Sequence, residues 1–124
     1  MDSSSLTRGQ IERTLSQRIQ ALYRIQLEHQ PSKVTCQLFD EKIAIILEDS
    51  ITQPERLLVN SGEQELAEQV RTELSEALQP QLKALIEEVV GVPVIDLLSN
   101  AKLETGRTAT IAILAHTPQV RNPS

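Results

Sequence analysis

Residues 34–47, VTCQLFDEKIAIIL, predict a β-hairpin that sets the fold of this chain. Apolar residues alternate with polar ones from Val34 to Leu38, which is typical of a strand buried on one face. Asp40-Glu41 supplies the turn, and the return strand, residues 43–47, is apolar throughout. Such an uninterrupted apolar run indicates a central strand that is covered on both faces.

A second hairpin is predicted near the end of the chain, where Ile111-Ala112-Ile113-Leu114 repeats the apolar phrase of the first return strand. Glu104-Thr105-Gly106 predicts a three-residue loop with its glycine in the left-handed conformation. The apolar face of the outgoing strand includes Leu97 and Ala101. It is expected to continue on the return strand through Ala109, Ile111 and Ile113.

A long amphipathic helix precedes each hairpin. The first is expected to begin after Thr7, where Thr7 and Gln10 form a capping box, and to end before Pro31. The second is expected from about Glu63 to Val90, with a kink or a short restart at its interior Pro80. Its expected buried stripe consists of Leu66, Val70, Leu74, Leu78, Leu82, Leu85 and Val89.

A short helix is predicted between the two halves of the chain, opened by a capping box over residues 52–55, and a third box over residues 61–64 opens the long helix that follows. The order is therefore α-β-β-(short α)-α-β-β. This order predicts an α+β fold in which antiparallel hairpins pack against two long helices on one side of the sheet. Residues 7–116 are expected to form a single domain between disordered ends, residues 1–6 and 117–124.

Composition excludes several classes of protein. Tyr23 and Phe39 are the only aromatic residues, which argues against the stacking platforms of single-stranded nucleic-acid binding. The net charge of −5 is concentrated in residues 55–88, and phosphate backbones require clustered positive charge instead. No apolar run approaches the ~20 residues of a membrane span. We therefore expect a cytoplasmic protein with no nucleic acid partner and no direct membrane insertion.

Residues capable of chemistry are few and scattered. Cys36 lies on the apolar side of its strand, where a cysteine acts as a small hydrophobe, and a single cysteine fits a reducing compartment. His29 and His116 lack the spacing of metal ligands. The adjacent carboxylates Glu87 and Glu88 point apart on a helix, so they do not share a ligand. The sequence predicts no catalytic residue, no metal site and no cofactor, and hence a protein that is not an enzyme.

Contact residues are expected at the second hairpin turn, because it projects from the sheet and carries charge of both signs. The candidate binding residues there are Glu104, Thr105, Gly106 and Arg107. The mildly basic outer face of the first helix adds Arg13 and Arg24 as further candidates. In the alternative interpretation, Gly106 only closes the hairpin and Arg107 only solvates it.

Several segments together resemble one bacterial family. They are residues 31–34, 47–55, 80–94 and 103–107, with Pro54, Pro80, Gly91, Thr105, Gly106 and Arg107 as the matching positions. The chain resembles the MpsC-like (YbcI-type) family over about residues 6–114. This resemblance implies a role accessory to an ion or inorganic-carbon transport system, and it implies no catalytic residues. The run at residues 96–101 departs from the polar, histidine-containing run of the relatives.

Three functions remain open at the level of sequence. The first is a non-catalytic binding or regulatory module with a protein partner. The second is a small metal- or ligand-dependent sensor or enzyme, and the third, nucleic-acid binding, has the least support. Because apolar strand faces require cover, we also expect the chain to form a homodimer with two-fold symmetry.

Overall fold

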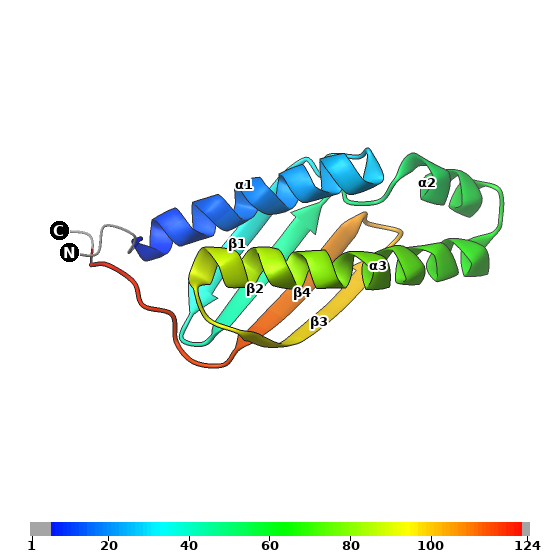
Figure 1. The fold of residues 1–124 in the computed structure, drawn as a ribbon. Coiled ribbons are helices and arrows are strands. Elements are labelled where there is room, and N and C mark those ends of the chain that lie inside the picture. The colour runs from blue at the N-terminus through cyan, green and yellow to red at the C-terminus, as the bar shows by residue number, and fades with distance from the viewer. Residues whose placement is uncertain (1–5, 123–124) are drawn as a thin grey trace.

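The computed structural model describes residues 6–122. The elements follow the predicted order, so the α+β fold is confirmed (Figure 1). Their bounds are α1 Arg8–Leu27, β1 Lys33–Phe39, β2 Lys42–Glu48, α2 Gln53–Asn60, α3 Gln64–Val90, β3 Val94–Lys102 and β4 Arg107–Leu114. Of the ends predicted to be disordered, residues 1–5 and 123–124 lie outside the described residues. In the described part of the tail, the backbone N–H of Arg121 donates to the Leu6 carbonyl at 2.8 Å.

The four strands form one antiparallel sheet in the order β1-β2-β4-β3. The two return strands, β2 and β4, therefore lie side by side at the centre, while β1 and β3 are the edges. Ile45 of β2 pairs with Cys36 on one side and with Thr110 on the other. The register of β3 shifts between Val94 and Asp96, which is an irregularity of the kind common at sheet edges.

Both long helices lie on the same face of the sheet (Figure 1). α1 packs on β1, α3 packs on β3, and the two helices contact each other. Because no described element covers the opposite face, the prediction that β2 is covered on both sides is wrong. Ala44 and Ile46, which point to that uncovered face, are only partly buried by their neighbours.

Of the three capping boxes predicted at helix starts, two are present. The Thr7 hydroxyl accepts from the Gln10 N–H, and the Gln10 side chain accepts from the Thr7 N–H, so the first capping box is confirmed. The box of Thr52 and Glu55 at the start of α2 is also present. The third predicted box is absent, because α3 begins at Gln64 after Glu63, which makes no side-chain cap.

α3 is continuous from Gln64 to Val90 and runs through Pro80 without a restart. Its C-terminal half buries residues of the predicted stripe, but its N-terminal half does not. Leu66 is 44% exposed, and the buried residues there are Ala67 and Arg71. In this half the predicted buried stripe is wrong by one residue: Ala67 and Arg71 are buried in place of Leu66 and Val70. The apolar pattern cannot reveal this, because Arg71 is a charged residue in a buried position.

The core fills the space between the helices and the inner face of the sheet. Its sheet contribution comes mainly from β2, whose Ile43 and Ile45 are fully buried. On β4 the predicted apolar face is wrong: Thr108 and Thr110 point inward and are buried, whereas Ile111 and Ile113 point away from the helices. As a result, the core contains the hydroxyl groups of Thr108 and Thr110, and the uncovered face of the sheet contains the apolar side chains of β4.

Candidate functional site

The predicted contact turn between β3 and β4 packs against the loop after β2. Gly106 has φ 74°, so its predicted left-handed conformation is confirmed, although the loop contains four residues, 103–106, rather than three. The Gly106 carbonyl accepts from the Ser50 N–H at 2.8 Å and from the Ser50 hydroxyl at 3.0 Å. The Thr105 hydroxyl accepts weakly from the Arg107 N–H at 3.4 Å. Gly106 is therefore buried in the fold, while Glu104 and Thr105 remain exposed.

Ion pairs reinforce the outside of this junction. Arg107 Nε donates to Glu48 Oε1 at 2.7 Å, and Arg56 pairs with Asp49. A His29 ring nitrogen lies 2.8 Å from the Asp49 carbonyl oxygen. All these side chains are at least partly exposed, and such pairs typically contribute no more than about 1 kcal/mol to stability.

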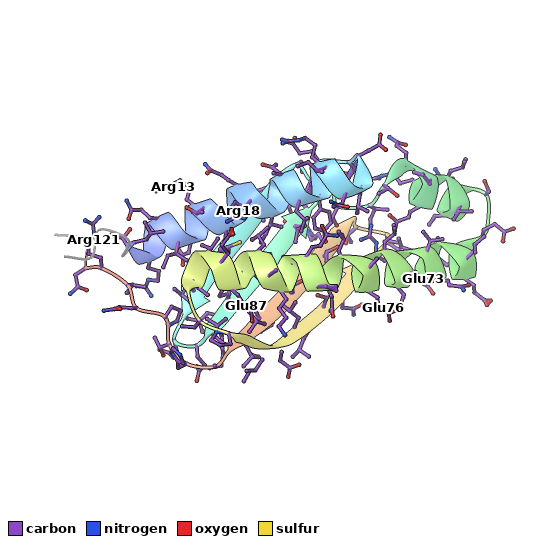
Figure 2. The ribbon with its side chains drawn as sticks, in the orientation of Figure 1. Arg13, Arg18, Glu73, Glu76, Glu87 and Arg121 are labelled. Carbon is purple, nitrogen blue, oxygen red and sulfur yellow. The ribbon has the colours of Figure 1, made fainter. Side chains whose placement is uncertain are left out.

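The other predicted contact residues lie elsewhere. Figure 2 shows Arg13 near the start of α1, at the end of the molecule away from the turn between β3 and β4. Arg24 lies in the last turn of α1, and both side chains are exposed. No hydrogen bond or ion pair within residues 6–122 joins either arginine to residues 104–107. The structure therefore does not assemble these six candidates into one site.

A buried ion pair, which the sequence analysis missed, links α2 to α3. Arg71 Nε donates to Glu55 Oε2 at 2.7 Å, and Nη2 donates to Oε1 at 2.6 Å. Nη2 also donates to the Ser50 carbonyl at 3.1 Å, and Glu55 Oε1 accepts from both the backbone and the hydroxyl of Thr52. Glu55 is 0% and Arg71 5% exposed. This network joins the loop after β2 to both helices that follow it.

The carboxylate of Glu55 is held in its ionised form. Burial opposes ionisation and is the largest single effect, but hydrogen bonds from Arg71 and Thr52, with the Arg71 charge, outweigh it. The pKa of Glu55 is consequently lowered. Nearby, burial raises the pKa of the Tyr23 hydroxyl against the opposing influence of Arg71. The network therefore contains one buried anion and one buried cation at neutral pH.

A pocket of about 500 Å³ lies beside Arg71, between α3 and the β3–β4 end of the sheet. Arg71 Nη1 is buried and has no hydrogen-bond partner among the described residues. The pocket is also lined by Glu68, Glu76 and Glu104. Because these carboxylates outnumber the one remaining cation in its lining, Lys102, the pocket disfavours an anionic ligand.

The remaining reactive groups are separated from one another. Cys36 is buried, and burial raises its pKa to about 11, so the thiol stays protonated at neutral pH. The ring of His116 makes only a long 3.4 Å contact with the neighbouring Thr117 carbonyl. No group of three potential metal ligands occurs within residues 6–122.

The uncovered face of the sheet, which we call the open face, contains four rows of residues that run across the strands. Register alone defines them, because directly paired residues of antiparallel strands share a face. Each row is named after its residue on β3. The rows are Lys33-Glu48-Arg107-Lys102 (Lys102 row), Thr35-Ile46-Ala109-Asn100 (Asn100 row), Gln37-Ala44-Ile111-Leu98 (Leu98 row) and Phe39-Lys42-Ile113-Asp96 (Asp96 row).

The two middle rows of the open face carry no charge. On the central strands they present Ile46, Ala109, Ala44 and Ile111, and Leu98 on the edge strand is 56% exposed. The outer rows carry the charges: three cations and one anion in the Lys102 row, one of each in the Asp96 row. An apolar centre inside a polar rim is the usual anatomy of a protein interface.

The layer of helices offers a different surface. Figure 2 shows Glu73, Glu76 and Glu87 along α3, and Arg13 and Arg18 on α1. Arg18 pairs with Glu88 across the two helices. The outer surface of the helices is thus rich in charge, although Ile25, Leu57 and Leu66 are also exposed on α1, α2 and α3. The apolar residues of the central strands lie side by side on the open face.

One of the predicted contact residues belongs to the open face. Arg107 lies in its Lys102 row, beside Glu48. The face as a whole was missed because the sequence analysis placed Ile111 and Ile113 in the core. The alternation of Thr108 and Thr110 with apolar residues was the available signal, but it does not by itself say which side faces the helices.

Comparison with known proteins gives one positive result. The family model described as "Na+-translocating membrane potential-generating system (MpsC)" matches residues 7–116. No protein with a curated description and no solved structure matches the chain. Among the described residues, no helix has the length and apolar character needed to cross a membrane. The match spans all seven elements and both hairpins, and it confirms the predicted resemblance: the chain belongs to the MpsC family.

Proposed function

We propose that this chain is a non-catalytic accessory module of a membrane-potential-generating system, and that it acts by binding protein through the open face of its sheet. The observation that carries this proposal is the phase of β4, which turns Ile111 and Ile113 away from the helices. Ile111, with Ala109 beside it and Ala44 and Ile46 of β2, forms an apolar centre on a face that has no cover among the described residues, and Ile113 lies at its edge.

Burial of this centre provides the driving force for binding. Removing apolar surface from water contributes about 25 cal/mol per Å², and exposed side chains such as Leu98 have most of their surface still to bury. The sheet is also a rigid platform, since its other face is anchored in the core through Ile43 and Ile45. Binding there requires little ordering, which favours affinity.

The non-catalytic part of the proposal is supported by how the reactive groups are used. Glu55 and Arg71 neutralise each other inside the fold. Cys36 is a buried, protonated thiol on the inner face of β1. A cytoplasmic location belongs to the same proposal, because a single free thiol fits a reducing compartment.

Site-specific photo-cross-linking in the native cell tests the proposal. A photo-reactive amino acid replaces Leu98 in the open face, and a matched control replaces Glu73 on the outer side of α3. We expect covalent protein adducts from position 98 and few from position 73. Adducts of equal yield at both positions, or none at position 98, would contradict the proposal.

A further inference from the structure

We infer that the partner on the open face is a second copy of this chain, with the strands of the two sheets running in opposite directions. This inference rests on the proposed function, since it names the occupant of the same surface. A two-fold axis lying between the sheets and perpendicular to the strands would generate the pair. Each strand then lies over its own copy, and the order of the rows is reversed.

Four of the six charged residues in the outer rows meet an opposite charge in this arrangement, while Lys33 and Arg107 lie over Phe39 and Ile113. On β3, Asp96 of one copy lies over Lys102 of the other. On β2, Lys42 lies over Glu48 in the same way, and within their own chain these two residues also pair with Glu41 and Arg107. Because the axis relates the two copies, each contact occurs twice. Asp96 and Lys102 are exposed, and neither forms an ion pair with another described residue, so both charges are free to pair across an interface.

The middle rows are complementary in size. When the rows are reversed, the Asn100 row lies over the Leu98 row. Ile46 then faces Ala44 of the other copy, and Ala109 faces Ile111. A large side chain meets a small one in both central strands, which lets the two faces approach to the usual distance of about 10 Å between packed sheets.

The other two-fold arrangement is electrostatically worse. An axis parallel to the strands would place β1 over β3 and keep each row over itself. Lys33 would then lie over Lys102, and Asp96 would lie over Phe39 with no countercharge, which leaves Glu48 over Arg107 as the one attractive charge contact. Juxtaposed like charges suppress such pairings. The charges therefore select the reversed arrangement.

Sedimentation at micromolar concentration and a charge-exchange experiment test this inference. For the wild type we expect a species of twice the 13.8 kDa chain mass. Asp96→Lys places a lysine over Lys102, and Lys102→Glu places a glutamate over Asp96. We expect each variant alone to self-associate about tenfold more weakly, since like charges then meet at two places.

Mixing the two variants is the decisive step. In a mixed pair the lysine introduced at position 96 meets the glutamate introduced at position 102 at one end, and the native Asp96 meets the native Lys102 at the other. We therefore expect a tagged Asp96→Lys chain to capture Lys102→Glu in preference to its own kind, with association restored to near the wild-type level. Lys83→Glu on α3 makes the same charge reversal away from the open face, at an exposed residue, and should change nothing.

Three results would overturn the inference: a wild-type chain that stays monomeric, no recovery on mixing, or stronger association of Lys102→Glu alone, which the parallel axis predicts. These results are distinct from failure of the proposed function. A monomeric chain that still yields adducts with other proteins at position 98 would leave the binding role intact and reject only the second copy. Absence of adducts at position 98 would reject the binding role itself.

Discussion

Arg71 shows how one residue can determine the character of half a core. It lies on the same buried side of α3 as Ala67 and Leu78, and it is held there by Glu55 and the Ser50 carbonyl. A buried ion pair of this kind is weak evidence for added stability, because desolvation offsets much of the attraction. Its removal from one side only, however, leaves an uncompensated charge.

Arg71→Met should therefore destabilise the fold by about 3–5 kcal/mol, the usual effect of breaking a buried pair. Arg107→Ala is the matched control, because it removes an arginine from the exposed pair with Glu48 and should change stability by less than about 1 kcal/mol. Urea denaturation of the three proteins provides the measurement. Equal losses in both variants would show that the Glu55–Arg71 pair has no special role.

The pair also predicts an acid response. Since the folded-state pKa of Glu55 is lowered, its contribution to stability is present above the ordinary carboxyl pKa of about 4.3 and is lost as the pH falls through the folded-state value. Wild-type protein should lose more stability between pH 7 and acid than Glu55→Gln loses. Parallel stability curves for the two proteins would contradict the assignment.

The burial of Cys36 predicts slow reaction of its thiol in the native protein. With its pKa raised to about 11 and its side chain buried, the thiol should react with a disulfide reagent far more slowly than free cysteine at pH 8. In urea above the unfolding midpoint the rate should rise to that of an exposed thiol. Rapid labelling of the native protein would mean that the β1 side of the core opens readily.

At the scale of elements, the turn between β3 and β4 and the interior proline of α3 both follow backbone rules. A Cβ added at Gly106 would meet Arg56 Nη2 at 3.6 Å and the Asp49 Cα at 3.7 Å, which are ordinary contacts. Space is therefore available, and the restriction at this position comes from the positive φ.

Gly106→Val should cost about 1–3 kcal/mol, because a β-branched residue is strained in the left-handed conformation. Gly106→Asn, whose side chain tolerates that conformation, is the control and should cost less. Thermal unfolding compares the variants. A valine variant as stable as the wild type would indicate that the turn changes its conformation freely.

Replacing Pro80 inside α3 is expected to raise the stability of the fold. It is exposed, and as a proline it lacks the N–H that would complete the hydrogen bonding of α3. Pro80→Ala should raise stability by up to about 3 kcal/mol, which is the difference in helix propensity. An unchanged or lower melting temperature would show that the helix needs the proline for its path over β3.

The elements themselves could be predicted from sequence because turns, caps and proline act locally. The Thr7 and Thr52 boxes, the glycine at position 106 and the order of helices and hairpins all follow from signals within a few residues. The orientation of β4 could not be predicted in this way. Two sets of residues alternate along β4: Thr108, Thr110 and Ala112 form one face, and Ala109, Ile111 and Ile113 form the other. Alternation alone does not say which face the helices cover, because that depends on tertiary packing.

The site was hidden for the same reason. Glu55 was recognised as the end of a capping box, but its pairing with Arg71 spans 16 residues and depends on how α2 lies against α3. Likewise, the four rows of the open face exist only once the sheet order β1-β2-β4-β3 is known. Arg107 was found because its turn is distinctive, whereas Lys102, which pairs with it, and Asp96, in the opposite outer row, gave no comparable local signal.

At the scale of the whole molecule, the charge-rich helices lie on one side of the sheet, and the open face with its uncharged middle rows lies on the other. Association through that face combines an apolar centre with charge pairs at its rim. Exposed charge pairs are screened as the Debye length falls from about 10 Å at 0.1 M salt to about 3 Å at 1 M, whereas burial of apolar area persists.

Self-association of the wild type should therefore weaken moderately, by a few-fold, between 0.1 M and 1 M sodium chloride without being abolished. Asp96→Lys should show the opposite trend, since salt screens its repulsion. Sedimentation across the salt series provides the measurement. Identical salt dependence of the two proteins would place the contact away from the Asp96 and Lys102 rows.

The order β1-β2-β4-β3 has a further consequence. Each half of the sheet is one hairpin, with its first strand at the edge and its second strand at the centre. Each hairpin is covered by one helix, and the two helices, α1 and α3, run antiparallel (Figure 1). A pseudo-two-fold axis normal to the sheet between β2 and β4 thus relates residues 8–48 to residues 64–114. The two halves of the chain thus repeat one α-β-β layout, α2 links them, and the buried Glu55–Arg71 pair fastens that link to the second half.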